Sequence, residues 1–151
     1  MDLAEVSYDA SLRRLDKQER LLDELRARTG LLLAAASLAA SFLGRPALDS
    51  DPVALAVLAL AAFAVTIAAS LYVLLPKKNL VFALVGSRVF EELYEFRGEI
   101  PEVHRRLTYD LDRFWEANDR IMQRLIWVFR VAAWALAIEI GSLLTSLTDT
   151  L

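Results

Sequence analysis

Apolar residues recur along the last third of the chain at alternating spacings of four and three, the repeat of one helical face. No proline or glycine occurs between Glu102 and Ile140. The pattern therefore predicts one helix from Pro101 to about Ser146, roughly 70 Å long at about 1.5 Å per residue. The positions on this face, called the seam below, are Leu107, Leu111, Phe114, Asn118, Ile121, Leu125, Val128, Ala132, Ala135, Glu139, Ser142 and Ser146.

The surroundings of the seam change along this long helix, residues 101–148. Up to about Arg130 the other positions are largely charged, and from there to Asp149 they are almost wholly apolar. We therefore expect a helix that begins in water and ends across a bilayer, with a membrane span at about Trp127–Leu147.

The first part of the chain likewise changes from charged to apolar residues. Residues 1–28 predict a charged amphipathic helix, either solvated on one side or part of an oligomerising coiled coil. Residues 29–44 carry no charge, and although they fall short of the usual ~20, Arg28 and Arg45 could complete a span by snorkelling. A signal peptide is disfavoured because its polar leader would be long and mixed in charge.

The middle of the chain predicts a loop, a second span and a further helix. Residues 45–51 are turn-rich, and the pair Asp51 and Pro52 is typical of a helix start. Residues 52–76 hold an uncharged run long enough to cross a bilayer. Residues 77–100 predict an amphipathic helix that packs on the long helix or lies on the membrane. The predicted fold is all-α: a polytopic membrane protein with three transmembrane helices and a helical cytoplasmic body.

The distribution of positive charge predicts the orientation. Of the 17 lysine and arginine residues, only Arg45 lies in the loop 45–51. The positive-inside rule then puts that loop and the C-terminus outside, and the N-terminus in the cytoplasm, across the inner (plasma) membrane. The expected anchors at the membrane interface are Tyr72, Lys77, Lys78, Trp127 and Arg130.

The composition excludes several classes of catalytic and metal-binding site. The chain has 151 residues, is 56% hydrophobic, and contains one histidine and no cysteine. Disulfides, thiolate catalysis and cysteine-based metal sites are thereby excluded. A formal net charge of −3 gives no general reason to bind nucleic acid. Phosphate-loop, zinc-protease and serine-hydrolase motifs are missing. We therefore expect no enzyme, no cofactor and no metal site.

Glu139 is the one ionisable residue inside a predicted span. A buried carboxylate in a membrane is costly, so it should face protein or water, or carry a proton. Its depth matches that of Ser37 and Thr66, and we expect these three to form a polar layer where the helices meet. Glu139 could bond a hydroxyl and hold helices together, line an oligomeric pore or proton-linked gate, or contact a substrate. The residues expected to flank the layer are Ser41, Ser70 and Ser142.

Other positions point to helix packing. Asn118, polar within the seam, predicts control of register and subunit number, or a contact within one chain. His104 is expected on the surface, and Trp115 against the helix within 77–100. Small residues, which let helices in lipid approach closely, form one stripe at Gly30, Ala34, Ser37, Ser41 and Gly44 and another at Ala59, Ala62, Thr66 and Ala69.

The layout resembles small bacterial membrane effectors of nucleotide-signalling defence, namely the SLATT proteins and the transmembrane effectors of Pycsar systems. The shared features are a charged helix running into Arg28-Thr-Gly-Leu-Leu-Leu, a close pair of spans and a helical cytoplasmic segment, mostly within residues 11–130. The resemblance implies oligomerisation and membrane permeabilisation on a nucleotide signal. Two features depart from it: a third predicted span, and the lack of a separate nucleotide-sensing domain.

Two functions follow as expectations. The first is a homo-oligomeric inner-membrane effector or channel-like protein that perturbs permeability on a signal. The second is a non-conducting scaffold or accessory subunit that docks a partner through its cytoplasmic helices. The expected partners are the lipid bilayer, further copies of the chain, and a partner protein or nucleotide sensor in the cytoplasm.

Overall fold

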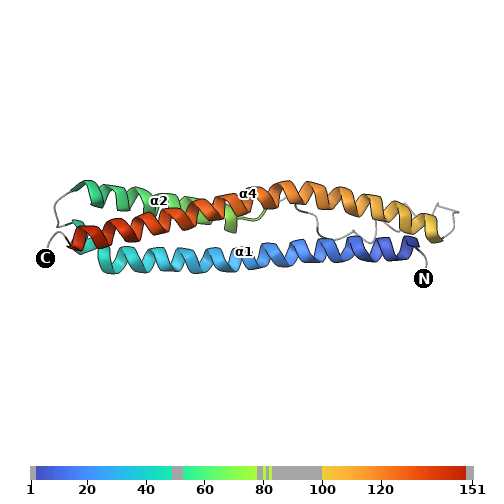
Figure 1. Cartoon of the computed structure of the whole chain (residues 1–151), viewed down its shortest axis with the longest axis horizontal. Coiled ribbons are helices and arrows are strands. Elements are labelled where there is room, and N and C mark those ends of the chain that lie inside the picture. The colour runs from blue at the N-terminus through green and yellow to red at the C-terminus, as the bar shows by residue number, and fades with distance from the viewer. Residues whose placement is uncertain (1–2, 49–52, 78–79, 81, 83–99, 149–151) are drawn as a thin grey trace. The chain divides into compact units, whose positions relative to one another are not determined.

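The computed structural model describes residues 3–48, 53–77, 80, 82 and 100–148, and every regular element in them is a helix. These are α1 (Leu3–Leu48), α2 (Val53–Leu74) and α4 (Ile100–Thr148), as Figure 1 shows. The predicted all-helical class is confirmed. So is the unbroken long helix, since α4 begins one residue before Pro101 and continues past Ser146.

The seam of α4 is its packing face. All twelve of its positions are buried or half-buried, while the exposed positions between them carry charge in the first half and large apolar side chains in the second. The spacing of four and three residues keeps these side chains on one side of the helix along its whole length. The chain therefore uses the seam for contacts among its own helices.

α1 extends further than expected. It joins residues 1–28 and 29–44 in one helix and continues through Arg45 and Pro46. The expected loop 45–51 is therefore wrong at its beginning. Proline lacks the N–H that would bond the carbonyl four residues earlier, yet α1 ends two residues after Pro46 rather than at it. Residues 49–52, Lys78 and almost all of the helix expected within 77–100 lie outside the described residues.

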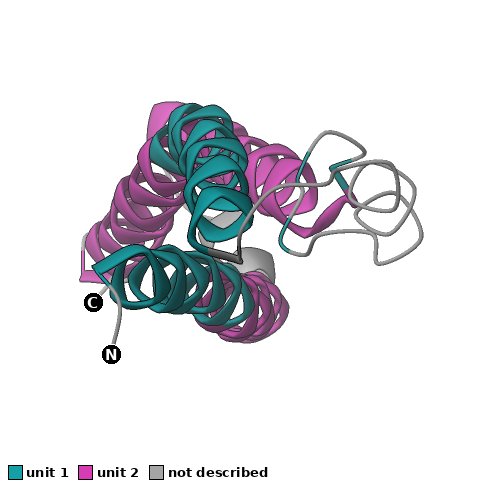
Figure 2. Ribbon diagram, turned by 90° about the vertical axis from the view of Figure 1, so that its right-hand side faces the viewer, with its two compact units in different colours: residues 1–23, 77–123 teal, residues 24–76, 124–151 magenta. Residues whose placement is uncertain are grey.

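The chain divides into two compact units, coloured separately in Figure 2. Unit 1 comprises residues 1–23 and 77–123. In it, α1 and α4 run parallel, because contacts advance together along both helices, from Tyr8 with His104 to Gln18 with Trp115. The exposed positions are mostly charged. The largest buried apolar side chains of unit 1 are Leu15, Leu22, Leu111 and Met122.

Unit 2 comprises residues 24–76 and 124–151, so it holds the second half of α1, all of α2 and the second half of α4. α2 runs antiparallel to the other two helices (Figure 1). Ala59 of α2 and Leu143 of α4 pack together as a buried cluster. Small residues line the packed face of α2, which buries Ala56, Ala59, Ala62, Thr66, Ser70 and Val73.

Unit 2 has a more apolar surface than a water-soluble bundle. Its interior holds several polar side chains, while many of its large apolar side chains are exposed. Examples are Phe42 at 75%, Leu60 at 65% and Trp134 at 73%. The polar residues buried inside it are Thr29, Thr66, Ser70, Glu139, Ser142 and Ser146.

Within the described residues, α2 and α4 are long and apolar enough to cross a membrane. Only 33% of the most apolar part of α2, and 28% of that of α4, is buried. The core helix of a soluble protein would be mostly buried, since an all-round apolar helix needs an apolar environment on every side. No stretch within the described residues of α1 passes the same test.

Candidate functional site

Glu139 lies inside unit 2 on the seam of α4. Its side chain is 1% exposed, and neither carboxylate oxygen has a hydrogen-bond partner. The seam spacing explains the burial, because Ala132, Ala135 and Ser142 on the same face are buried too. An unpaired carboxyl group in a low-dielectric interior is costly. Among the described residues of unit 2, Glu139 is therefore the polar group whose burial costs the most free energy.

The register of α2 against α4 places the neighbours of Glu139. Ala59 packs with Leu143, and the two helices are antiparallel. Moving along α2 from Ala59 thus corresponds to moving back along α4 at about 1.5 Å per residue. Glu139 then lies opposite the turn between Ala62 and Thr66. Side chains lean toward the N-terminus of their own helix, so the Glu139 carboxyl group leans toward Thr66.

α2 brings two hydroxyl groups to this face. Thr66 is fully buried, and its hydroxyl donates to the Ala62 carbonyl at 2.9 Å. Ser70, one turn further, is also fully buried, and its Oγ has no hydrogen-bond partner. The structure thus buries Glu139, Thr66 and the flanking residues Ser70 and Ser142 on the faces where the helices of unit 2 meet.

Ser37 does not join this layer within the chain. It is exposed, and its hydroxyl donates to the Leu33 carbonyl of its own helix at 3.0 Å. Within the chain, α1 buries the neighbouring position Ala36 instead. Ser41 is likewise exposed, and its hydroxyl donates to the Ser37 carbonyl at 2.7 Å.

Thr29 is a buried polar residue that the sequence reading missed. It is fully buried, and its hydroxyl donates to the Leu25 carbonyl at 2.7 Å. The spacing of three and four residues could have revealed it, because Thr29 continues one helical face. That face holds Leu15, Gln18, Leu22 and Leu25. The reading gave priority to the small-residue stripe on another face of α1.

That stripe faces away from the other described helices. Gly30, Ala34, Ser37 and Ser41 are all exposed, and a Cβ atom added to Gly30 would meet nothing within 4 Å. The side chain of Gly44 lies outside the described part. The corresponding small residues of α2, by contrast, are used for packing inside unit 2.

Three of the expected interface anchors lie near one level of unit 2. By the register above, Tyr72 of α2 lies opposite the turn of α4 that holds Trp127 and Arg130. All three are exposed, Trp127 at 66% and Tyr72 at 45%. Lys77 is half-buried. Exposed aromatic and basic side chains at one level are typical of a membrane–water interface.

Polar contacts hold α1 to α4 in unit 1. The Ser11 hydroxyl donates to Asp112 Oδ1 at 3.0 Å, and Gln18 Nε2 donates to the Trp115 carbonyl at 3.2 Å. The Arg14 guanidinium lies 6.0 Å from the centre of the Trp115 ring, so the described packing of Trp115 is against α1. The seam residue Asn118 is 1% exposed.

His104 differs from its expected surface position. It is half-buried, and its ring stacks on that of Tyr8, with ring centroids 5.3 Å apart and an interplanar angle of 16°. Its carbonyl accepts a hydrogen bond from the Thr108 hydroxyl at 2.8 Å.

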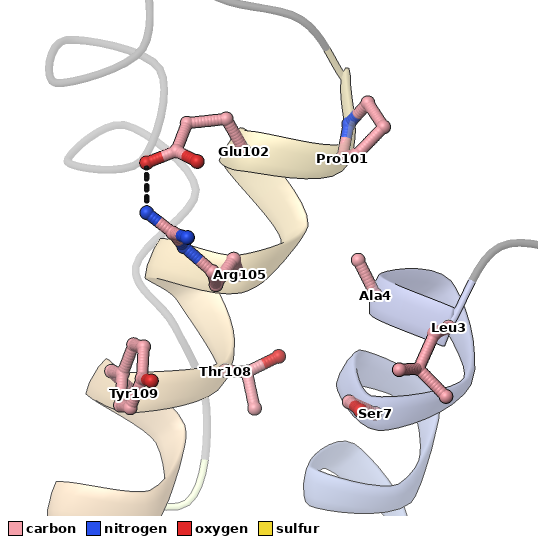
Figure 3. A pocket seen from close by; sticks show the side chains of 8 residues that line it. All are labelled: Leu3, Ala4, Ser7, Pro101, Glu102, Arg105, Thr108 and Tyr109. Carbon is pink, nitrogen blue, oxygen red and sulfur yellow. Dashed lines mark hydrogen bonds and ion pairs between the residues drawn. The ribbon is translucent and has the colours of Figure 1, made fainter.

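An open groove of about 490 Å³ lies between the first turns of α1 and α4 (Figure 3). One charged pair lies on its wall, where Arg105 Nη2 donates to Glu102 Oε1 at 2.8 Å. The remaining wall combines apolar groups with hydroxyls. The residues lining it are Leu3, Ala4, Ser7, Pro101, Glu102, Arg105, Thr108 and Tyr109.

No protein-family model, curated protein or solved structure matches this chain.

Proposed function

We propose that the protein is a small inner-membrane protein, embedded through unit 2, that assembles into a homo-oligomer and acts as an effector or channel-like protein on membrane permeability. The observation that carries the proposal is the apolar surface of unit 2, on which Trp134 is exposed while Glu139 lies inside. Such a surface is stable in lipid and would aggregate in water. No catalysis is assigned, because the sequence offers no catalytic motif.

The proposed topology has three spans. α2 is 22 residues long, which at about 1.5 Å per residue matches the ~30 Å hydrocarbon core. The second half of α4 runs beside it. The second half of α1 exposes Leu31, Leu38 and Phe42, which supports a third span. Unit 1 then lies in the cytoplasm with the N-terminus, and the C-terminus lies outside.

Assembly is proposed to use the exposed small-residue face of α1. In lipid, helices associate through small side chains that let backbones approach closely. The corresponding face of α2 is already occupied inside unit 2. Gly30, Ala34, Ser37 and Ser41 remain accessible to a second copy of the chain.

Glu139 cannot line a pore in the described arrangement, because one chain encloses it. Permeabilisation through a ring of Glu139 therefore requires α2 and α4 to separate first. We propose that a cytoplasmic signal drives this step, as the resemblance to nucleotide-signalling effectors implies. The sensor is either a partner protein or unit 1 itself.

Dye leakage from liposomes containing purified protein tests this function, together with subunit number from native mass spectrometry. Wild type should oligomerise and release dye. Ala34→Leu should reduce both, because it fills the small-residue face. Ala35→Leu is the matched control, since the neighbouring alanine lies on the face of Leu31 and Leu38. A strict monomer, or equal effects of the two variants, would refute the proposed assembly.

A non-conducting scaffold is the second candidate, and the groove of unit 1 favours it. The groove offers a partner protein the Glu102–Arg105 pair and the exposed side chain of Tyr109. The two functions differ in one readout, because a scaffold should release no dye in any state of assembly.

A further inference from the structure

Two exposed arginines of α4, Arg124 and Arg130, lie where the charged half of this helix changes to the apolar half. Another exposed arginine of unit 2, Arg28 of α1, forms an ion pair with Glu24 one turn earlier on its helix. Neither arginine of α4 has such a neighbour, because no position three or four residues away from either one is acidic. Among the described residues, their guanidinium groups form no ion pair or hydrogen bond.

Tryptophans alternate with these arginines on the same side of α4. Arg124, Trp127, Arg130 and Trp134 follow one another at spacings of three, three and four residues, so they share a face that the seam leaves free. All four belong to unit 2 and are exposed, Trp127 at 66% and Trp134 at 73%. These four residues are called the arginine–tryptophan face below.

The direction of the side chains carries the charge of Arg130 out of the apolar region. Helical side chains lean toward the N-terminus of their own helix, which in the proposed topology is the cytoplasmic end of α4. The long side chain of Arg130 therefore reaches past Trp127 toward the membrane surface, as snorkelling arginines do. Arg124 lies six residues, about 9 Å, nearer the water.

The chemistry of the arginine–tryptophan face selects its occupant. Guanidinium groups bind phosphate through paired hydrogen bonds, and tryptophan rings favour the boundary between headgroups and hydrocarbon. A phospholipid offers both surroundings in one molecule. A second copy that presented the same face would place arginines against arginines, and an acidic segment of a water-soluble protein would leave Trp134 without an apolar partner.

We propose that the arginine–tryptophan face binds the headgroup of an anionic phospholipid, with Arg124 and Arg130 on its phosphate and Trp127 beside it. A zwitterionic lipid such as phosphatidylcholine binds more weakly, because its ammonium group is repelled by the arginines. At the usual attraction of a basic residue to anionic lipid, two arginines favour the anionic lipid by on the order of tenfold. The site rests on the proposed embedding of unit 2 in a bilayer, but on neither oligomerisation nor leakage.

Quenching of tryptophan fluorescence by brominated lipids tests the site. Trp115→Phe removes the tryptophan of unit 1 and leaves Trp127 and Trp134 as the emitters. The protein is reconstituted in phosphatidylcholine vesicles with a small share of either brominated phosphatidylglycerol or brominated phosphatidylcholine. Phosphatidylglycerol should quench at roughly a tenfold lower share. Arg124→Gln combined with Arg130→Gln should abolish this difference.

The matched control is Arg13→Gln combined with Arg20→Gln, which removes the same charge from two exposed arginines of unit 1 and should leave the lipid preference unchanged. Equal quenching of wild type by the two lipids would indicate ordinary boundary lipid and overturn the site. An equal loss of preference in the control variant would overturn it as well.

Flotation of the vesicles separates failure of the site from failure of the proposed function. A protein that does not float with the vesicles is not embedded, which refutes both. A protein that floats, but whose tryptophans neither lipid quenches, has this face covered by another copy of the chain. That outcome overturns the lipid site alone.

Discussion

Thr66 and Thr145 make the same hydrogen bond in opposite surroundings. Each hydroxyl donates to the carbonyl four residues earlier, at 2.9 Å to Ala62 and 2.7 Å to Gly141. Thr66 is fully buried against its neighbours, whereas Thr145 is exposed. At the scale of the residue, therefore, burial rather than bond geometry decides which hydroxyl matters.

Thr66→Val should lower the free energy of unfolding by about 1 kcal/mol, because valine keeps the shape but removes a buried hydroxyl. Thr145→Val should change it by less than about 0.5 kcal/mol. Reversible unfolding in mixed detergent micelles measures both values. Equal losses for the two variants would show that burial does not increase the contribution of the Thr66 hydroxyl to stability.

At the scale of the element, one helix presents different faces to different neighbours. α1 packs Leu22, Leu25, Thr29 and Ala36 inward and exposes the small stripe that includes Ala34. α4 keeps a single packing face throughout but changes its exposed side chains from charged to apolar. The contact of α2 with α4 encloses Glu139, so a permeabilising state has to open this contact.

A disulfide between α2 and α4 should block that opening. The chain contains no cysteine, so Ala59→Cys with Leu143→Cys, at two positions packed together in the structure, forms the pair without competing thiols. The oxidised double variant should release dye no faster than empty liposomes release it, and a reducing agent should restore release. Each single variant is the control. Undiminished leakage from the cross-linked protein would show that the two helices need not separate.

At the scale of the whole molecule, the two units differ in the polarity of their surfaces. Unit 1 exposes charge over a core that includes Leu15 and Leu111, as soluble proteins do. Unit 2 exposes apolar side chains over an interior of small apolar and polar side chains. One chain thus carries surfaces suited to two solvents, which supports a protein anchored in a membrane with a helical part in water.

Single cysteines test the proposed topology in intact cells with a membrane-impermeant maleimide. Three spans predict labelling at Ser50→Cys and Thr150→Cys, and protection at Ser7→Cys and Thr108→Cys until the cells are permeabilised. If α1 does not cross, Ser7→Cys and Ser50→Cys will be labelled or protected together. Labelling of denatured protein controls for thiol reactivity.

The sequence by itself determined the helical class of the described residues and the packing face of α4. An uninterrupted heptad spacing from Leu107 to Ser146 leaves a helix one way to bury its apolar positions, and the structure follows it. It also indicated that Glu139 would be enclosed, because a single carboxyl group within an apolar run is costly to expose to lipid, and the structure buries it. The end of α1 was harder to predict, since a proline permits a helix to end near it without fixing where.

Only the tertiary structure decided which residues meet. On α1, two faces were both compatible with packing, and neighbouring helices selected the face of Thr29 and Ala36 over that of Ser37. It likewise put Glu139 inside a single chain. The periodicity of one helix shows which side packs but not against what. The partner depends on the register between helices, and contacts distant in sequence set that register.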